Sequence, residues 1–384
     1  MMRRDSIVDR LVGLPWFLLM MILGLASLGI VVLFSAGSGE IDPLTGNQVL
    51  NAQLSVAHAW RFGLLLLLAL GLALVPMRLW AAAAYPAYFV GVVCLILVEL
   101  FGVTVNGAER WLQIGPLRVQ PSELMKLAVP LALARFYHQI WEGERQSFWS
   151  HLWALIIVVI PTILVLRQPD LGTALTLMAA GFAVIFFAGI SLRIVVAVMV
   201  MVAAATPLIY FFALHDYQRR RVETLFNPEA DPLGAGYQLQ QALIAIGSGG
   251  VTGKGFLEGE QKQLDYIPEQ HTDFIFTIVA EEFGFMGSLA LLILWAVVIV
   301  QGMNIALRSR NLFGGLAAAG FVSTLFFYVT INIGMVIGLL PVVGIPLPLV
   351  SYGGNVMMTV MVGFGFLMAA HLNRDHQMAI RGVF

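Results

Sequence analysis

Apolar runs long enough to cross a bilayer recur along almost the whole chain, and they constrain its fold more than any other feature. A transmembrane helix needs about 20 mainly apolar residues. Ten segments meet or approach this length, centred on residues 14–36, 58–75, 80–101, 121–137, 152–167, 171–189, 191–214, 272–303, 311–340 and 349–371. The sequence therefore predicts an all-α polytopic membrane protein with about ten transmembrane helices, built as a single domain over residues 1–384.

Composition excludes the soluble classes of protein. Of the 384 residues, 59% are hydrophobic and 11% are charged, whereas soluble domains carry about 25% charged residues. The formal net charge of −1 argues against a nucleic-acid partner. The one cysteine, Cys94, cannot form an internal disulfide or a thiolate metal cluster.

Positive charge sets the predicted orientation, because the cytoplasmic loops of membrane proteins carry an excess of Lys and Arg. With the N-terminus inside, the inner loops and tail hold Arg78, Arg135, Arg145, Arg193, Arg308, Arg310, Arg374 and Arg381. The short outer loops hold Arg110, Arg118 and Arg167. An even number of spans then places both termini in the cytoplasm.

The polar motifs fall mostly in the outer loops of this topology, at 106–123, 167–170, 215–271 and 341–355. The segment 215–271 is one long extracytoplasmic loop between spans 7 and 8. Within it, Leu239, Leu243 and Ile246 share one helical face, which is typical of a helix lying in the membrane interface, and the glycines after it end that helix. Any chemistry is therefore expected to face away from the cytoplasm.

Asp273 lies at the edge of the eighth span, in the run PEQHTDFIF over residues 268–276. Ionised groups near hydrocarbon are costly and usually mark a functional site. Two interpretations stay open. The acid can cap the free amides at the start of the helix, with Thr272 competing for that role. It can instead act as a general base, because desolvation raises the pKa of a carboxylate and suits it to take a proton from a hydroxyl.

Two further acids, Glu281 and Glu282, lie deeper in the same span, about 12 Å from Asp273 at 1.5 Å per residue. By helical angle Glu281 lies nearer the Asp273 face, and Glu282 points to about the opposite side. Adjacent acids at that depth need a partner or water. An interhelical hydrogen bond or ion pair that fixes packing is one interpretation, and a role in binding or moving substrate is the other.

The fourth span opens with Glu123 and Lys126, which are three residues apart and can pair on one helical face. Lys126 can instead meet a substrate phosphate. Both interpretations stay open.

Two short loops carry further candidates. Arg110 can bind a phosphate with its planar guanidinium, and Trp111 beside it fits an aromatic belt at the interface. Asp170, with Thr173, can cap the helix that follows it.

The segment 341–355 is apolar, but its prolines forbid a regular helix. Non-helical backbone at membrane depth survives only where it is buried in protein or lines a wet cavity. Ser351 and Gly353, in the run SYGG, offer flexible backbone amides that can hold an anion. The alternative is a re-entrant turn that merely packs.

Taken together, these motifs resemble the SEDS family (shape, elongation, division, sporulation). The C-terminal signature runs from Asn332 through Gly338, Leu339, Pro341 and Gly344 to SYGGN, and Val356 then departs from the small residue usual in the family. Further blocks match at 110–112, 120–126, 168–173 and 271–276. The runs 227–238 and 253–255 resemble the elongation members of the family more than the division members.

The resemblance implies a peptidoglycan glycosyltransferase that polymerises lipid II during cell elongation, in the bacterial inner membrane, with its active site on the extracytoplasmic face. The 4-hydroxyl of one lipid-linked disaccharide attacks the anomeric carbon of another, undecaprenyl pyrophosphate leaves, and the anomeric centre inverts. The family's essential acid maps onto Asp273 and its functionally important tryptophan onto Trp111. A class B penicillin-binding protein is the implied partner and supplies the crosslinking.

The leaving pyrophosphate needs positive charge. Lys126, Arg110 and the arginine tract 219–221 are the candidates, and a divalent cation, Mg or Mn, can share the task, although no ligand set for one is evident. The complete set of expected substrate-binding residues is Trp111, Arg110, Lys126, Glu123, Asp170, Glu281, Ser351 and Gly353.

Two rival hypotheses remain. A lipid II flippase or other transporter would use Glu281, Glu282 and Lys126 as parts of a polar route across the bilayer. A non-catalytic scaffold of the elongation complex would position a partner enzyme.

Overall fold

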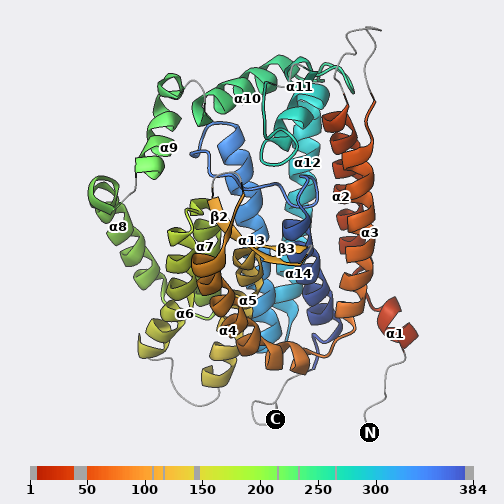
Figure 1. Ribbon diagram of the computed structural model, residues 1–384. Coiled ribbons are helices and arrows are strands. Elements are labelled where there is room, and N and C mark those ends of the chain that lie inside the picture. The colour runs from red at the N-terminus through yellow and green to blue at the C-terminus, as the bar shows by residue number, and fades with distance from the viewer. Residues whose placement is uncertain are drawn as a thin grey trace.

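The chain forms a bundle of long, mainly upright helices with shorter helices across one end (Figure 1). The computed structural model describes residues 7–38, 50–105, 108–115, 117–141, 148–213, 216–231, 234–263 and 266–376. Seven of the described helices are long and apolar enough to cross a membrane: α2 (Trp16–Gly37), α3 (Gln53–Ala73), α4 (Met77–Phe101), α6 (Phe148–Arg167), α12 (Ile275–Arg308), α13 (Leu312–Val336) and α14 (Gly354–Leu372).

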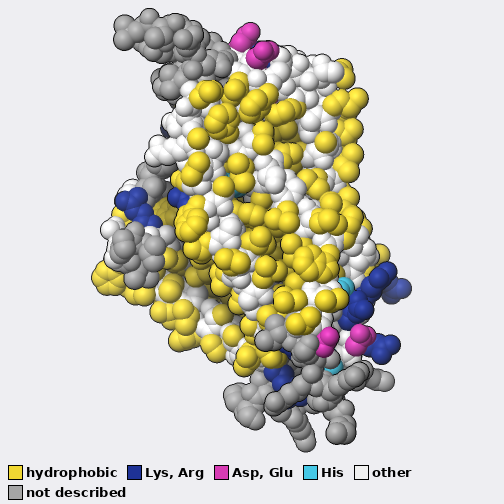
Figure 2. Space-filling model, turned by 90° about the vertical axis from the view of Figure 1, so that its right-hand side faces the viewer, with side chains coloured by type: hydrophobic (Ala, Val, Ile, Leu, Met, Phe, Trp, Pro, Cys, Tyr) yellow, Lys and Arg dark blue, Asp and Glu magenta, His cyan; other side chains and the backbone are white. Residues whose placement is uncertain are grey.

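Three further helices occupy the remaining predicted spans. They are α5 (Pro121–Trp141), α7 (Leu171–Phe187) and α8 (Leu192–Leu208), followed by the short π-helix η1 (Ile209–Ala213). The polytopic helical class is thus confirmed, and the number of crossings stays a prediction. On the face in Figure 2, hydrophobic side chains cover the middle of the molecule almost without charged ones, as a lipid-facing surface requires.

The predicted cytoplasmic location of both termini stays a prediction, because residues 1–6 and 377–384 lie outside the described residues. The short helix α1 (Ile7–Val12) and the last residues of α14 nevertheless lie at the same end of the bundle (Figure 1). A Cβ built at Gly13 would lie 3.2 Å from the side chain of Leu372. An even number of crossings is consistent with this arrangement.

The helical fold carries one small β-sheet, which the sequence did not predict. Three strands, β1 (Val103–Val105), β2 (Ala108–Ile114) and β3 (Leu117–Val119), form an antiparallel sheet in the order β1-β2-β3 between α4 and α5. Gly115, with φ of +61°, makes the turn between β2 and β3. The sequence placed this region in an outer loop, because strands of three to seven residues are too short to show a clear periodic pattern.

The end of the bundle opposite α1, called here the α10 end, carries the short helices α9 (Asp216–Phe226), η2 (Pro228–Ala230), α10 (Ala235–Gly249) and α11 (Glu260–Gln263). The helix predicted within the long loop is present as α10. Leu239 and Leu243 lie on one face as predicted, since both approach Gly338: a Cβ there would lie 3.6 and 3.8 Å from their Cδ1 atoms. Small residues bring α10 against α12, where a Cβ at Gly249 would clash with the carbonyl oxygen of Ala280.

Helix α12 is broken at Gly284, where φ is +65° and ψ is −159°. The loop after α10 fills the break. The amides of Phe285 and Met286 donate to the carbonyls of Gly250 and Val251 at 2.9 and 3.1 Å. This loop therefore satisfies backbone groups that the break leaves unpaired.

Candidate active site

Asp273 does not cap a helix, so the capping interpretation is wrong. Helix α12 begins at Ile275, its N-cap residue is Phe274, and no side chain accepts a capping bond there. Thr272, the predicted competitor, donates instead to Glu269 Oε2 at 2.6 Å. Within the described part of the chain, the Asp273 carboxylate forms no hydrogen bond or ion pair. The acid is half-buried.

The surroundings of Asp273 favour its protonated form. Burial raises the pKa of this carboxyl to about 7, and the nearby negative charges of Glu269 and Asp170 add to that rise. Arg221 and Arg110 oppose it. A carboxyl group that titrates near neutral pH can take up and release a proton during turnover.

The segment between α13 and α14 packs against Asp273. It is non-helical, as predicted, and several of its apolar side chains are buried in protein: Val343, Ile345, Leu347, Leu349 and Val350. A Cβ at Gly344, where φ is +75°, would lie 3.1 Å from Asp273 Oδ2. The segment therefore forms one wall beside the acid.

Asn332 on α13 ties this wall to the acid. Its Nδ2 donates to the backbone oxygen of Asp273 at 2.8 Å and to that of Ile345 at 2.6 Å. A second tie is made by the amide of Tyr352, which donates to the carbonyl of His271 at 2.9 Å. The position of Asp273 is therefore set by two elements distant from it in sequence, α13 and the segment that follows α13.

The predicted anion-binding turn has two different halves. Ser351 is buried and its Oγ accepts from the amide of Leu347 at 2.8 Å, so this side chain holds the turn. Gly353 is half-exposed, and nothing lies within 4 Å of a Cβ built there. Between these residues, Gly353 is the one with room for a ligand.

The capping prediction for Asp170 is confirmed, since its Oδ1 accepts from the amide of Thr173 at 3.1 Å. Arg110, on β2, lies 3.9 Å from the same carboxylate oxygen. Its guanidinium also donates to the carbonyls of Gln168, at 3.2 Å, and Pro169. Trp111, the next residue, is half-buried opposite Val103 in the sheet. Arg110 thus holds the turn before α7 close to Asp273.

Glu123 and Lys126 form the internal ion pair that the sequence allowed. Lys126 Nζ lies 2.6 Å from Glu123 Oε1 and 2.6 Å from the hydroxyl of Tyr328, which itself donates to Glu123 Oε2 at 2.5 Å. Lys126 is 1% exposed. The sequence did not identify Tyr328, because the two residues are 202 positions apart.

Glu281 and Glu282 are both buried and both have partners, as the packing interpretation predicted. Glu281 Oε1 lies 3.0 Å from Lys254 Nζ and accepts from the amide of Gln261 at 3.1 Å. Glu282 Oε1 accepts from Ser35 Oγ on α2 at 2.5 Å. The partner of Glu281 belongs to the loop after α10 rather than to another spanning helix.

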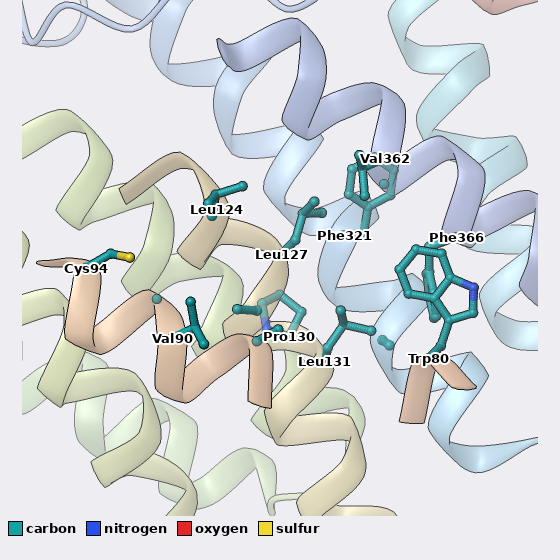
Figure 3. A pocket seen from close by; sticks show the side chains of 15 residues that line it. Trp80, Val90, Cys94, Leu124, Leu127, Pro130, Leu131, Phe321, Val362 and Phe366 are labelled. Carbon is teal, nitrogen blue, oxygen red and sulfur yellow. The ribbon is translucent and has the colours of Figure 1, made fainter. Parts of the chain in front are cut away.

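A metal site and an enclosed cavity are two other features that could bind a ligand. Among the described residues, no group of three or more His, Cys, Asp or Glu side chains is placed to hold a metal ion. An apolar cavity of about 290 Å³ lies between α4, α5, α13 and α14 (Figure 3). Its lining includes Trp80, Leu124 and Phe321 and none of the predicted site residues. It can hold hydrocarbon but supplies no acid or base.

The sequence is similar to a known protein family and to several of its members. A family model described as "Cell cycle protein", covering FtsW, RodA and SpoVE, matches residues 15–376. Peptidoglycan glycosyltransferase MrdB of Escherichia coli K12 is 48% identical over 303 residues, 79% of this chain and 81% of that protein. A probable peptidoglycan glycosyltransferase FtsW of Idiomarina loihiensis is 35% identical over 369 residues, 94% of this chain and 86% of that protein.

Solved structures agree with the sequence comparison. The rod shape determining protein RodA of Thermus thermophilus is 30% identical with a TM-score of 0.68, covering 94% of this chain and 98% of that chain. A chain from "Structural coordination of polymerization and crosslinking by a peptidoglycan synthase complex" is 32% identical with a TM-score of 0.79, covering 94% of this chain and 98% of that chain. This chain therefore belongs to the SEDS family, the family of FtsW, RodA and SpoVE.

Proposed function

We propose that this protein is a peptidoglycan glycosyltransferase of the elongation type, with Asp273 as its general base. The observation that carries the proposal is the state of this carboxyl group: half-buried, unpaired within the described structure, and with a pKa raised to about 7. The glycosyltransferase names of the relatives from E. coli and Idiomarina loihiensis support the reaction class.

In the proposed reaction, Asp273 takes the proton from the 4-hydroxyl of the acceptor sugar. The hydroxyl oxygen then forms a bond to the anomeric carbon of the lipid-linked donor. The bond from that carbon to the pyrophosphate oxygen breaks, and its electron pair leaves with undecaprenyl pyrophosphate. Lipid II is the proposed substrate, because its prenyl tail needs hydrocarbon and its sugars need water, as a site at the membrane boundary provides.

The proposed setting is the bacterial inner membrane, with Asp273 on the extracytoplasmic side. The excess of arginine in the opposite loops supports this orientation. A class B penicillin-binding protein is the proposed partner. The solved relative from a peptidoglycan synthase complex, which couples polymerization and crosslinking, supports a partner of this kind.

A divalent cation, Mg²⁺ or Mn²⁺, is proposed to share the charge of the leaving pyrophosphate, bound through the substrate. We expect a chelator to slow polymerisation and added Mg²⁺ to restore it. Equal rates before and after chelation would remove the cation from the proposal.

The deciding experiment uses purified protein in liposomes with lipid II, the crosslinking partner and no ATP. Glycan strands on a gel, made by the unaltered chain and lost in Asp273→Asn, are the expected result. Glu229→Gln, which changes an exposed carboxylate of the long loop, is the matched control. Transbilayer movement of lipid II without polymer would favour the transporter, and full polymerisation by Asp273→Asn would remove the base assignment.

A further inference from the structure

Three of the expected phosphate ligands, Lys126, Arg110 and Arg219, are engaged elsewhere in the structure, which leaves room for a further cation at the pyrophosphate. The Lys126 ammonium is buried between Glu123 and Tyr328. The Arg110 guanidinium binds two carbonyls and faces Asp170. Arg219, in the arginine tract, donates to the carbonyls of Tyr210 and Phe211 at 3.0 and 2.7 Å.

Arg61 is a cation that sequence reasoning did not single out. It lies on α3, eight positions after Gln53 at the start of the helix, and so about 12 Å along the helix axis. Its side chain is half-buried, and in the described ranges no carboxylate pairs with it. Arginines within membrane helices almost always pair with another group or face a water-filled cavity, so an unpaired guanidinium at this depth indicates a place that a ligand can occupy.

The contact of Arg61 points toward the active site. Its guanidinium carbon lies 4.7 Å from the centroid of the Tyr352 ring. That ring also packs edge-on against His271, at 6.5 Å between centroids, and the Tyr352 amide donates to the His271 carbonyl. The Tyr352 ring therefore contacts both the Arg61 guanidinium and His271, which lies two residues before Asp273.

Two glycines follow Tyr352 in the chain. A Cβ at Gly354 would lie 4.0 Å from Arg61 Cδ, and one at Gly353 would meet nothing within 4 Å. The side chain of Tyr352 is half-exposed. The space at Gly353, next in the chain to the ring that the guanidinium contacts, is therefore where a ligand can approach Arg61.

We propose that Arg61 binds the pyrophosphate of the prenyl-linked donor, close to the Asp273 base. This inference rests on the proposed function. The planar guanidinium presents paired N–H donors that match two phosphate oxygens. The prenyl chain then extends into lipid beside α3, and the sugar lies toward Asp273.

The test measures binding of farnesyl pyrophosphate to the purified full-length chain, with farnesol as the uncharged probe. We expect Arg61→Gln to weaken farnesyl pyrophosphate binding by at least about tenfold, as loss of a charge-assisted pair would. Arg61→Lys should lose less, because it keeps the charge but not the fork. Farnesol binding should not change. Arg78→Gln, which alters an exposed arginine at the start of α4, is the matched control.

Other outcomes separate the proposals. If Arg61→Gln melts lower but binds farnesyl pyrophosphate as the unaltered chain does, Arg61 only clamps Tyr352 and the inference is overturned. If phosphatidylglycerol in nanodiscs displaces the probe equally well, the ligand is a phospholipid headgroup and the inference also fails. If Arg61→Gln does not fold, the Arg61→Lys comparison decides.

Binding and turnover can fail separately. A chain that binds farnesyl pyrophosphate through Arg61 but makes no glycan would refute the proposed function and leave the Arg61 site standing. A chain that polymerises lipid II with the same kcat/KM and probe affinity after Arg61→Gln would refute the Arg61 site alone.

Discussion

Two carboxylates near hydrocarbon, Asp273 and Glu123, have opposite environments in this molecule. Glu123 is buried on α5, with one oxygen accepting from Lys126 and the other from Tyr328. Asp273 is half-buried before α12 and has no such partner among the described residues. Its nearest charges include two other acids, which raise its pKa.

The comparison shows that the partners of an acid, more than its depth, indicate its role. A paired buried carboxylate is held in one geometry and contributes to the fold, and removing one partner leaves an uncompensated charge. An unpaired carboxylate with a pKa near neutrality does not stabilise the fold and is available for proton transfer.

The largest expected effect is on turnover at Asp273. We expect Asp273→Asn to lower the polymerisation rate by about 10²-fold or more, the usual contribution of a general base. The melting temperature should not fall, because the substitution removes a partly desolvated charge. Rates and thermal unfolding measured on the same preparation would test both halves. A variant that is inactive because it has unfolded would break the contrast with Glu123.

The next effect is on stability at the buried pair. Lys126→Met should cost about 3–5 kcal/mol of unfolding free energy, because buried Glu123 loses its counter-charge and keeps only the hydrogen bond from Tyr328. The double variant Glu123→Gln/Lys126→Met should recover part of that loss. Equilibrium unfolding in detergent would measure the cycle. Native stability in Lys126→Met together with a raised KM for lipid II would instead return Lys126 to the substrate site.

A substitution in the segment between α13 and α14 should disturb Asp273 without changing its carboxyl group. Gly344→Ala should slow polymerisation by roughly tenfold or more, because its Cβ would lie 3.1 Å from Asp273 Oδ2 and its φ of +75° suits glycine. Gly115→Ala is matched for backbone strain, with φ of +61°, but nothing lies within 4 Å of its Cβ. Equal losses in the two variants would attribute the effect to strain alone.

The smallest effect expected is a shift in pH dependence. Asp273 must lose its proton to act, so kcat/KM should rise as pH climbs through about 7. Glu269→Gln removes a neighbouring negative charge and should move this inflection to lower pH, by less than about one unit, since burial is the larger cause. A pH–rate profile of each protein measures the shift. An inflection that stays in place would exclude Glu269 as a cause.

Much of the fold was predictable, because hydrophobic length and proline position act locally. The helices at 14–36 and 80–101 follow from their apolar runs, and the non-helical wall follows from its prolines. The capping role of Asp170 was likewise readable from its spacing to Thr173. The strands around Trp111 were missed, since segments this short carry no periodic pattern that separates a strand from a loop.

The site was only partly predictable. The sequence identified Asp273 as a candidate, but it could not distinguish a helix-capping role from a catalytic role for this residue. Arg61 was missed because a lone arginine in an apolar run carries no motif, and its significance depends on Tyr352, 291 positions along the chain, lying beneath it.

By itself the sequence determined a membrane-embedded helical bundle with its polar motifs gathered on one side, because the apolar length of a span and the loops between spans are properties of consecutive residues. Only the tertiary structure decided which of these charges are paired. Tyr328 lies 202 positions from Lys126, and Asn332 lies 59 positions from Asp273, so these contacts depend on distance in space rather than along the chain.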